Sequence, residues 1–492
     1  MSNFRYSPLD LAKNTIRLLL IHKGNWKDDI FCTLIEALSD ADEGIPYKAL
    51  SYTWGGDKHR PGGPENLPNV WVDNQQFDKS PLTDNLFGAL RQIREIDRDV
   101  VLWTDAICID QSNDTEKGHQ VNQMGAIYSA AEEVLVWLGP GNEYTEALMK
   151  TINWINQRAE GFLRDQETKS YQQWFNTCRF FALEHLKYIE SPSGSSYRRV
   201  LEELLSRKWF KRVWVLQEIA LAKTAIILCG SSSCTARTFG VMPALLGIEV
   251  DDSTQARLDV MPRIRKRTWW SSQRRLHHLI GKFGASEATI ARDRIYALLH
   301  MSEDARGLEC LRPCYKKSDS EVFRDTASFI MFGEVLSHEH ALPEFTIAEL
   351  GLPILQLVEK AFSWALREGG RNNEAAQKTV NTIIEYLSQG RLECDELLKS
   401  LSKKHSLLPE VSLLLSHGKA FLTSSFGEKG CMLKITSAGR MTQTVQLSFP
   451  KDNPAIPLLV AQEDDMSGIP PMERFLSERP NLPDVWAGQG VR

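Results

Sequence analysis

The stretch that decides the fold runs from Asp99 to Pro140 and begins Asp-Val-Val-Leu-Trp-Thr-Asp-Ala-Ile-Cys-Ile-Asp-Gln over residues 99–111. Residues 100–104 are apolar and rich in β-branched and aromatic side chains, which predicts a strand buried on both faces of a sheet. A polar turn, a helix over 115–131 and a second apolar run at 134–138 follow, and Gly139-Pro140 ends that run. This order predicts a βαβ unit.

The residues before this stretch continue the same alternation. Residues 47–53 predict a strand that runs into the glycine turn Trp54-Gly55-Gly56, and Ser80-Pro81 predicts the start of a helix over 81–97. Strands alternating with amphipathic helices predict a mainly parallel sheet with helices on both faces. The expected core residues all lie on apolar runs or stripes: Leu86, Leu90, Trp103, Val136, Trp214 and Leu216.

The remaining elements are predicted by composition alone. Strands are expected at 16–21 and 224–229 and a small hairpin at 70–77, whereas 32–39 fits either a strand or a helix. Helices are expected over most of 143–188, over 201–223, 291–299 and 321–332, and over most of 352–404. Beyond residue 418 we expect a small β element and an irregular tail rich in proline.

Composition limits the class of protein. A chain of 492 residues predicts two or three domains, and the net charge of −5 argues against a dedicated nucleic-acid-binding protein. Nine cysteines without regular spacing indicate reduced thiols and an intracellular protein rather than a disulfide framework or a metal site. The N-terminus does not look like a signal peptide, and no apolar run is long enough to span a bilayer.

Glu218 is the first candidate functional residue. On a helix its neighbours at three and four positions, such as Trp214 and Leu221, are all apolar, so the carboxylate needs a partner from elsewhere in the fold. A hydrogen-bonded structural carboxylate is about twice as common in this situation as one that contacts a ligand or acts in catalysis. Without a partner its pKa is expected to rise.

The acidic strand end gives further candidates. In parallel sheets ligands gather at the carboxyl ends of strands, where Asp105 and Asp110 lie, although Asp105 could equally cap the following turn. Trp54 could stack on a ligand ring or pack in the core. Cys108 is expected to be a small buried hydrophobe rather than a nucleophile. No glycine-rich nucleotide fingerprint occurs, so ordinary dinucleotide or ATP binding has no support.

A basic stretch at residues 263–267 is followed by Thr268, Trp269 and Trp270. It could form a nucleic-acid or anionic-lipid patch. A solvated helix face beside a packed aromatic pair is the favoured interpretation, because no nucleic-acid motif accompanies it.

Three blocks of the sequence resemble the fungal heterokaryon incompatibility (HET) domain. They are Tyr47-Lys-Ala-Leu-Ser-Tyr-Thr-Trp-Gly55, Leu102-Trp-Thr-Asp-Ala-Ile-Cys-Ile-Asp-Gln111 and Arg207-Lys-Trp-Phe-Lys-Arg-Val-Trp-Val-Leu-Gln-Glu218. The resemblance covers about residues 47–219. It implies a lead-in at 1–46, the HET domain at 47–219, a helical extension at 220–340 and a mostly helical C-terminal region at 341–492.

The resemblance also implies a function. HET domains are associated with programmed cell death after fusion of genetically unlike hyphae, which implies a cytoplasmic protein of a filamentous fungus that assembles with itself or with another incompatibility protein. They are thought to be similar to TIR domains, which have a flavodoxin-like parallel sheet. Some TIR domains cleave NAD with a glutamate, and Glu218 is the residue that could play that part here. NAD would then be a substrate, no cofactor or metal is expected, and the candidate ligand-binding residues are Ser51, Trp54, Asp105, Asp110 and Gln111.

Overall fold

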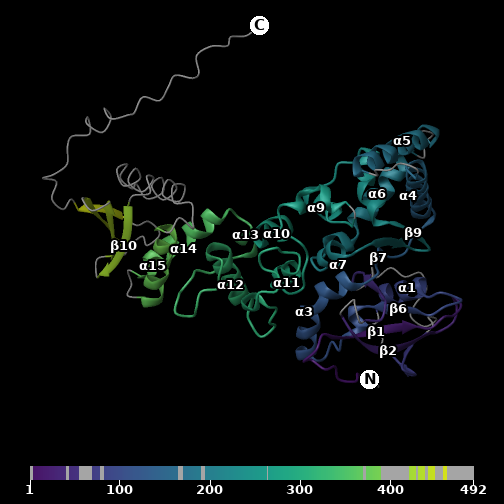
Figure 1. The fold of residues 1–492 in the computed structure, drawn as a ribbon, viewed down its shortest axis with the longest axis horizontal. Helices are drawn as coiled ribbons and strands as arrows, with labels where there is room; N and C mark the ends of the chain where they lie inside the picture. Colours follow the sequence, from purple (N-terminus) through teal and green to yellow (C-terminus); the bar gives the residue numbers. More distant parts are fainter. Residues whose placement is uncertain are drawn as a thin grey trace, which may run out of the picture. The chain divides into compact units, whose positions relative to one another are not determined.

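The computed structural model of the chain describes residues 4–39, 44–54, 69–77, 83–164, 170–189, 194–262, 264–369, 373–388, 420–427, 430–437, 441–448 and 458–462 (Figure 1). The chain divides into two compact units. The first comprises Met1–Val335 with Glu344–Pro353, and the second comprises Leu336–Pro343 with Ile354–Arg492.

The first unit is built on a nine-stranded sheet with the strand order β5-β4-β2-β1-β6-β3-β7-β8-β9. The strands are β1 (Thr15–Ile21), β2 (Ile30–Leu38), β3 (Lys48–Ser51), β4 (Val70–Val72), β5 (Gln75–Gln76), β6 (Val100–Trp103), β7 (Glu133–Trp137), β8 (Ala225–Cys229) and β9 (Ser232–Thr235). The apolar runs therefore form strands as predicted, and residues 32–39 belong to a strand rather than a helix.

The sheet is mixed, so the prediction of a mainly parallel sheet is wrong in its outer part. The strands β6, β3, β7 and β8 run parallel in that order, and β2 pairs parallel with β4. The strand β1 is antiparallel to both β2 and β6, and β8 is antiparallel to β9. The connections explain part of this, because only eight residues join β1 to β2 and two join β8 to β9, too few for a parallel crossover.

The first unit has helices between the strands of this sheet and directly after β9. They are α1 (Asp84–Ile93), α2 (Asp105–Cys108), α3 (Asp114–Ala130), α4 (Glu143–Phe162), α5 (Tyr171–Ile189), α6 (Gly194–Ser206), α7 (Val215–Leu221) and α8 (Ala236–Leu246). On α3, Tyr128 donates a hydrogen bond to the backbone oxygen of Leu50 in β3 (2.9 Å), and its ring meets Trp103 of β6 edge-on. This packing fixes α3 over the carboxyl ends of two parallel strands.

Two predicted features, the turn Gly55-Gly56 and the helix start Ser80-Pro81, lie outside the described residues. The described part of α1 begins at Asp84, and the side chain of Thr83 accepts a hydrogen bond from the backbone nitrogen of Leu86. Thr83 is therefore the N-cap.

The continuous helix predicted over 201–223 is wrong. The chain instead forms α6, a 3-10 turn η2 (Lys208–Lys211) and α7, with extended backbone at Arg207 and Arg212. Tertiary contacts override the helical pattern. Arg207 donates to the backbone oxygen of Leu138 (2.9 Å), and Arg212 donates to that of Tyr52.

The rest of the first unit consists of short helices. They are α9 (Asp252–Asp259), η3 (Arg265–Arg267), η4 (Trp269–Ser271), α10 (Leu276–Phe283), α11 (Asp293–Leu299), η5 (Glu309–Leu311), α12 (Asp319–Phe332) and α13 (Ile347–Leu350). Gly125 of α3 lies against the ring of His300, which follows α11, and a Cβ atom at position 125 would come within 2.5 Å of that ring. Glycine is therefore required at this crossing.

Five of the six expected core residues are fully buried: Leu86, Leu90, Trp103, Val136 and Leu216. Trp214 is the exception because it is half-buried and lies on the wall of a cleft.

The second unit contains α14 (Ile354–Gly369), α15 (Glu374–Ser388) and a four-stranded antiparallel sheet. Its strands are β10 (Ala420–Gly427), β11 (Gly430–Ser437), β12 (Met441–Ser448) and β13 (Leu458–Gln462), in sequence order. The predicted small β element is present, and the predicted helix over 352–404 is confirmed in its described part. Residues 389–404 and the proline-rich tail lie outside the described residues.

Candidate functional site

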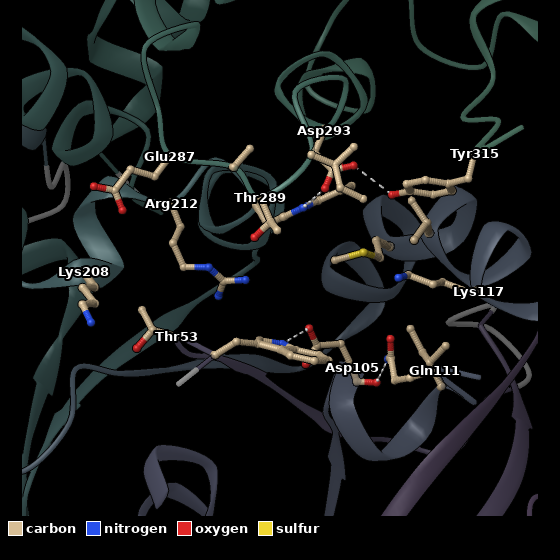
Figure 2. A pocket seen from close by; sticks show the side chains of 17 residues that line it. Thr53, Asp105, Gln111, Lys117, Lys208, Arg212, Glu287, Thr289, Asp293 and Tyr315 are labelled. Carbon is tan, nitrogen blue, oxygen red and sulfur yellow. Dashed lines mark hydrogen bonds between the residues drawn. The ribbon is translucent and has the colours of Figure 1, made fainter. Parts of the chain in front are cut away.

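A cleft with a volume of about 570 Å³ lies beside the carboxyl ends of β3 and β6 (Figure 2). In the sheet β3 lies between β6 and β7, both of which follow it in the chain, and ligands bind where a strand order reverses in this way. The volume is within the usual range for small-molecule sites. The lining side chains are Thr53, Trp54, Asp105, Ile109, Gln111, Lys117, Val121, Met124, Lys208, Arg212, Trp214, Glu287, Ala288, Thr289, Ile290, Asp293 and Tyr315.

Asp105 is the central acidic group of this cleft. It is the first residue of the single-turn helix α2, directly after β6. Its Oδ2 accepts a hydrogen bond from Nε1 of Trp54 (2.8 Å), and its backbone oxygen accepts one from Nε2 of Gln111 (2.8 Å). The structure therefore brings Trp54, Asp105 and Gln111 together at one surface.

The surroundings of Asp105 disfavour its charge. Burial raises the pKa of this carboxyl, and the nearby guanidinium of Arg212 opposes the rise. The Tyr52 hydroxyl and the backbone nitrogen of Ala106 also interact with the carboxylate and lower its pKa, so the fold itself partly offsets the cost of burying this charge.

The cations of the cleft are matched by carboxylates. Figure 2 shows Arg212 and Lys117 pointing into the cavity from opposite walls, and Lys208 lines it as well. Asp105, Glu287 and Asp293 line the same cavity. Among the described lining residues the two signs are equal in number, so these side chains suit a ligand of mixed polarity better than a polyanion.

One wall comes from residues 287–315, which follow α7 by more than sixty positions. The backbone nitrogen of Val213 donates to the oxygen of Glu287 (3.0 Å), and the nitrogen of Glu287 donates to the oxygen of Lys211 (2.7 Å). Asp293 anchors the next turn, because it accepts hydrogen bonds from Tyr315 (3.0 Å) and from Nε1 of Trp214 (3.3 Å). Burial raises the pKa of Asp293, and both bonds oppose the rise.

The sequence analysis missed Lys117, Arg212, Asp293 and Tyr315. The sequence does carry a signal for Asp293. Like Glu218, it is a carboxylate on a helix whose other residues are mostly apolar. The other three lie on a solvated helix face or on irregular backbone, where nothing local distinguishes them.

Glu218 lies outside the cleft lining, next to Ser51. Its side chain is only 4% exposed, and Oε2 accepts a hydrogen bond from Oγ of Ser51 (2.5 Å), which in turn accepts one from Nε1 of Trp209 (2.8 Å). Burial raises the pKa of Glu218 to about 7, and Arg212 and the Ser51 hydrogen bond oppose the rise. The partner that its apolar helix face requires is thus Ser51, with Arg212 nearby.

Asp110 also lies outside the cleft lining. Its Oδ1 accepts hydrogen bonds from the backbone nitrogen (3.0 Å) and the hydroxyl (2.6 Å) of Ser112, so it stabilises its own turn. Cys108 is fully buried, and burial raises the pKa of its thiol to about 12, which fits the expected role of a small hydrophobe.

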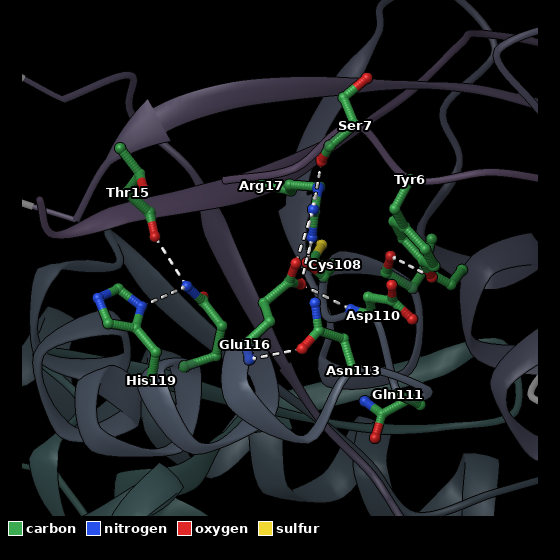
Figure 3. A network of polar contacts seen from close by, with 12 residues as sticks. Tyr6, Ser7, Thr15, Arg17, Cys108, Asp110, Gln111, Asn113, Glu116 and His119 are labelled. Carbon is green, nitrogen blue, oxygen red and sulfur yellow. Dashed lines mark hydrogen bonds and ion pairs between the residues drawn. The ribbon is translucent and has the colours of Figure 1, made fainter. Parts of the chain in front are cut away.

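A buried ion pair holds the loop that carries Gln111 (Figure 3). Arg17 of β1 contacts both carboxylate oxygens of Glu116 of α3, at 2.5 Å and 3.0 Å, and both side chains are almost completely buried. Arg17 also donates to the backbone oxygens of Ser7 (2.6 Å) and Cys108 (3.2 Å). Glu116 also accepts a hydrogen bond from the backbone nitrogen of Asp110 (2.8 Å). The Arg17–Glu116 ion pair therefore connects the N-terminal segment to the edge of the cleft.

Within the described residues, no group of three or more His, Cys, Asp or Glu side chains is arranged to hold a metal ion. Among the helices that the structure describes, none has the length and apolar character needed to cross a membrane.

Comparison with known proteins gives two matches. Residues 47–218 match the family described as heterokaryon incompatibility protein (HET). The chain is also similar to heterokaryon incompatibility protein 6, OR allele, of Neurospora crassa, with 27% identity over 375 residues that cover 67% of this chain and 54% of that protein. The chain therefore spans about half the length of this curated relative. No solved structure matches the chain.

Proposed function

We propose that this protein, whose residues 47–218 match the heterokaryon incompatibility family, is an effector of programmed cell death triggered by nonself and acts by assembly with itself or with a partner protein. The observation that carries the proposal is that the matched residues include the cleft-lining Trp54, Asp105, Lys117 and Arg212. The name of the Neurospora relative, an incompatibility protein, supports the same biological role.

The finer fold assignment supports this proposal. The parallel strands β6, β3, β7 and β8 have the order 2-1-3-4 when they are numbered by their place in the chain. This is the strand order of a flavodoxin-like sheet, to which TIR domains also belong. We therefore propose a TIR-like core, extended by the antiparallel strands β1 and β9.

The position of Glu218 favours assembly over NAD cleavage. A carboxylate that stabilises positive charge on a ribose must contact it, yet Glu218 is 4% exposed and is hydrogen-bonded to Ser51. Among the residues that the structure describes, the cleft beside it has as many lining carboxylates as lining cations, so these residues supply no surplus positive charge for a pyrophosphate.

One observation keeps the enzyme as the second candidate. Trp54 and Asp105 line one cleft of about 570 Å³, where an aromatic ring could stack on the indole. In this alternative the loop after β3 would have to move so that Glu218 reaches the cleft. Trp54, Asp105 and Gln111 are then the proposed ligand-binding residues, and Ser51 and Asp110 position their neighbours.

The test is inducible expression of the full chain in a filamentous fungus, with growth, cellular NAD and complex size followed together. Assembly predicts growth arrest with large complexes and unchanged NAD. A fall of NAD before growth stops would support the enzyme instead, and normal growth at high protein levels would overturn both.

A pair of variants adds the site to this test. Asp105→Asn keeps an acceptor for Trp54 but removes the charge, whereas Asp114→Asn makes the same change at an exposed position on α3 outside the cleft. We expect only Asp105→Asn to relieve the growth arrest.

A further inference from the structure

A second concave surface lies where α7 ends, away from the cleft. It is lined by Arg265, Lys266, Trp270, Ser271 and Arg274 together with Ala220 and Leu221 of α7, and its volume is about 510 Å³. We call it the α7-end pocket. Arg265 and Lys266 belong to the basic stretch at 263–267, for which a solvated helix face was the favoured interpretation, whereas Arg274 lies beyond that stretch.

The structure corrects that interpretation. The stretch forms the two 3-10 turns η3 and η4 instead of an α-helix, and Trp269 and Trp270 pack edge to face with their ring centroids 5.9 Å apart. These turns curve the chain, so Arg265 and Lys266 line the same hollow as Arg274.

The positive charge of this pocket is poorly compensated. Three cationic side chains line it and no carboxylate does. The ion pair of Arg274 with Glu303 is long, at 4.0 Å, and both side chains are more than one third exposed, so it contributes little. Lys266 is exposed and makes no ion pair with any residue that the structure describes.

Arg265 supplies part of the floor. One nitrogen of its guanidinium, Nη1, donates to the backbone oxygens of Ala220 (2.5 Å) and Ala222 (3.0 Å) at the end of α7. Burial and, to a smaller extent, the charge of Arg274 lower the pKa of Arg265. The two guanidinium groups are therefore close enough to repel each other.

One donor of Arg274 has no acceptor: its buried Nε makes no hydrogen bond with any residue that the structure describes. The guanidinium carbon of Arg274 lies 5.3 Å from the centroid of the buried Trp270 ring. The indole orients the guanidinium, and the unpartnered donor and the repulsion from Arg265 both carry a cost that an anion in the pocket would offset.

We propose that the α7-end pocket binds the phosphate group of a small molecule or of a lipid headgroup. The guanidinium of Arg274, the N–H groups of Arg265 other than those of Nη1, and the ammonium of Lys266 fit a phosphate dianion on this concave surface, because guanidinium groups pair with its oxygens in a fixed geometry and the ammonium adds a point charge. The cleft at β3 and β6 differs in this respect, since its cations face an equal number of carboxylates.

The test uses the full chain and three probes: inorganic phosphate, inorganic pyrophosphate, and vesicles of phosphatidylcholine with and without phosphatidic acid. Titration calorimetry measures the soluble probes, and co-sedimentation measures the vesicles. Binding of pyrophosphate or phosphate assigns the pocket to soluble phosphates, and binding of the phosphatidic acid vesicles alone assigns it to a headgroup. No binding of any probe at low ionic strength would overturn the proposal.

The variants are Lys266→Gln and Arg274→Gln, with Arg275→Gln as the matched control. Arg275 is exposed, follows Arg274 in the sequence and does not line the pocket. Arg275→Gln changes the net charge by the same amount as each pocket variant, so it controls for the charge alone. Each pocket variant is expected to weaken binding by about tenfold or more, as for the loss of a hydrogen bond to a charged group, whereas the control should change it less than about twofold.

Two further outcomes decide the question. Equal weakening by Arg275→Gln would indicate diffuse attraction to the surface and would reject a pocket. If Arg274→Gln fails to fold, as judged by circular dichroism, Lys266→Gln alone carries the test, because an exposed side chain without an ion pair does not support the fold.

Discussion

At the scale of single residues, Glu218 should make the free energy of unfolding depend on pH. Its folded-state pKa is about 7 and its ordinary value is 4.5, so the folded protein holds a proton that the unfolded chain releases between these values. The free energy of unfolding should therefore fall as pH rises from about 4.5 to about 7 and then stay level, with a total loss of about 3 kcal/mol from this group.

The variant Glu218→Gln should remove that slope. Glutamine keeps the shape and an acceptor for Ser51 but cannot ionise, so we expect the variant to match the wild type near pH 4.5 and to be the more stable protein at pH 8. Urea denaturation at a series of pH values measures this. A variant that is less stable than the wild type at pH 8 would show that the Arg212 attraction outweighs the cost of burial.

At the scale of secondary-structure elements, α1 depends on its buried stripe. Leu90 is fully buried there, so Leu90→Ala should lower the free energy of unfolding by about 2–5 kcal/mol. Ile96 lies beyond the end of α1 and is 73% exposed, so Ile96→Ala should change the free energy of unfolding by no more than about 0.5 kcal/mol. Chemical denaturation of both variants gives the comparison, and similar losses would contradict the burial of Leu90.

The ion pair that joins β1 to α3 should contribute about as much to the stability of the fold as the side chain of Leu90. Glu116→Gln leaves Arg17 buried without its counter-charge, which typically costs about 3–5 kcal/mol. Glu143→Gln removes a charge from an exposed position in the first turn of α4 and serves as the control. Thermal unfolding of the two variants should differ clearly. Equal melting temperatures would show that water reaches Arg17.

These elements also show how far the sequence predicts the structure. Runs such as Val100–Trp103 and Glu133–Trp137 are recognised because burial of a strand depends on local composition. Strand direction is not local, so nothing in β1 itself reveals that it pairs antiparallel with β6. The helix 201–223 was wrong for the same reason, since the breaks at Arg207 and Arg212 depend on partners at Leu138 and Tyr52.

The candidate site shows the same difference between features that depend on local sequence and features that depend on tertiary contacts. Asp105 and Trp54 could be predicted because a strand end and a glycine pair mark them in the sequence. The opposite wall could not be predicted, since Asp293 and Tyr315 reach the cleft through contacts with Trp214 and with each other. Glu218 was recognised as unusual, but whether its partner would be a ligand or Ser51 is a tertiary question.

At the scale of the whole molecule, every described residue that lines the cleft belongs to the first unit. A fragment of residues 1–353 retains the wall at 287–315, whereas a fragment of residues 1–230 exposes the apolar surface that this wall covers. We expect the longer fragment to be monodisperse with a cooperative thermal transition, and the shorter one to aggregate or to melt at a lower temperature. Light scattering and calorimetry decide this. A well-folded 1–230 fragment would show that the cleft wall adds nothing to stability.

The composite cleft has a consequence for heredity. Lys117 and Arg212 lie inside the matched segment 47–218, whereas Asp293 and Tyr315 lie beyond it. A crossover between two alleles near codon 250 would join the floor of the cleft from one parent to the wall from the other. Such a recombinant would combine floor and wall side chains from two parents in one cleft.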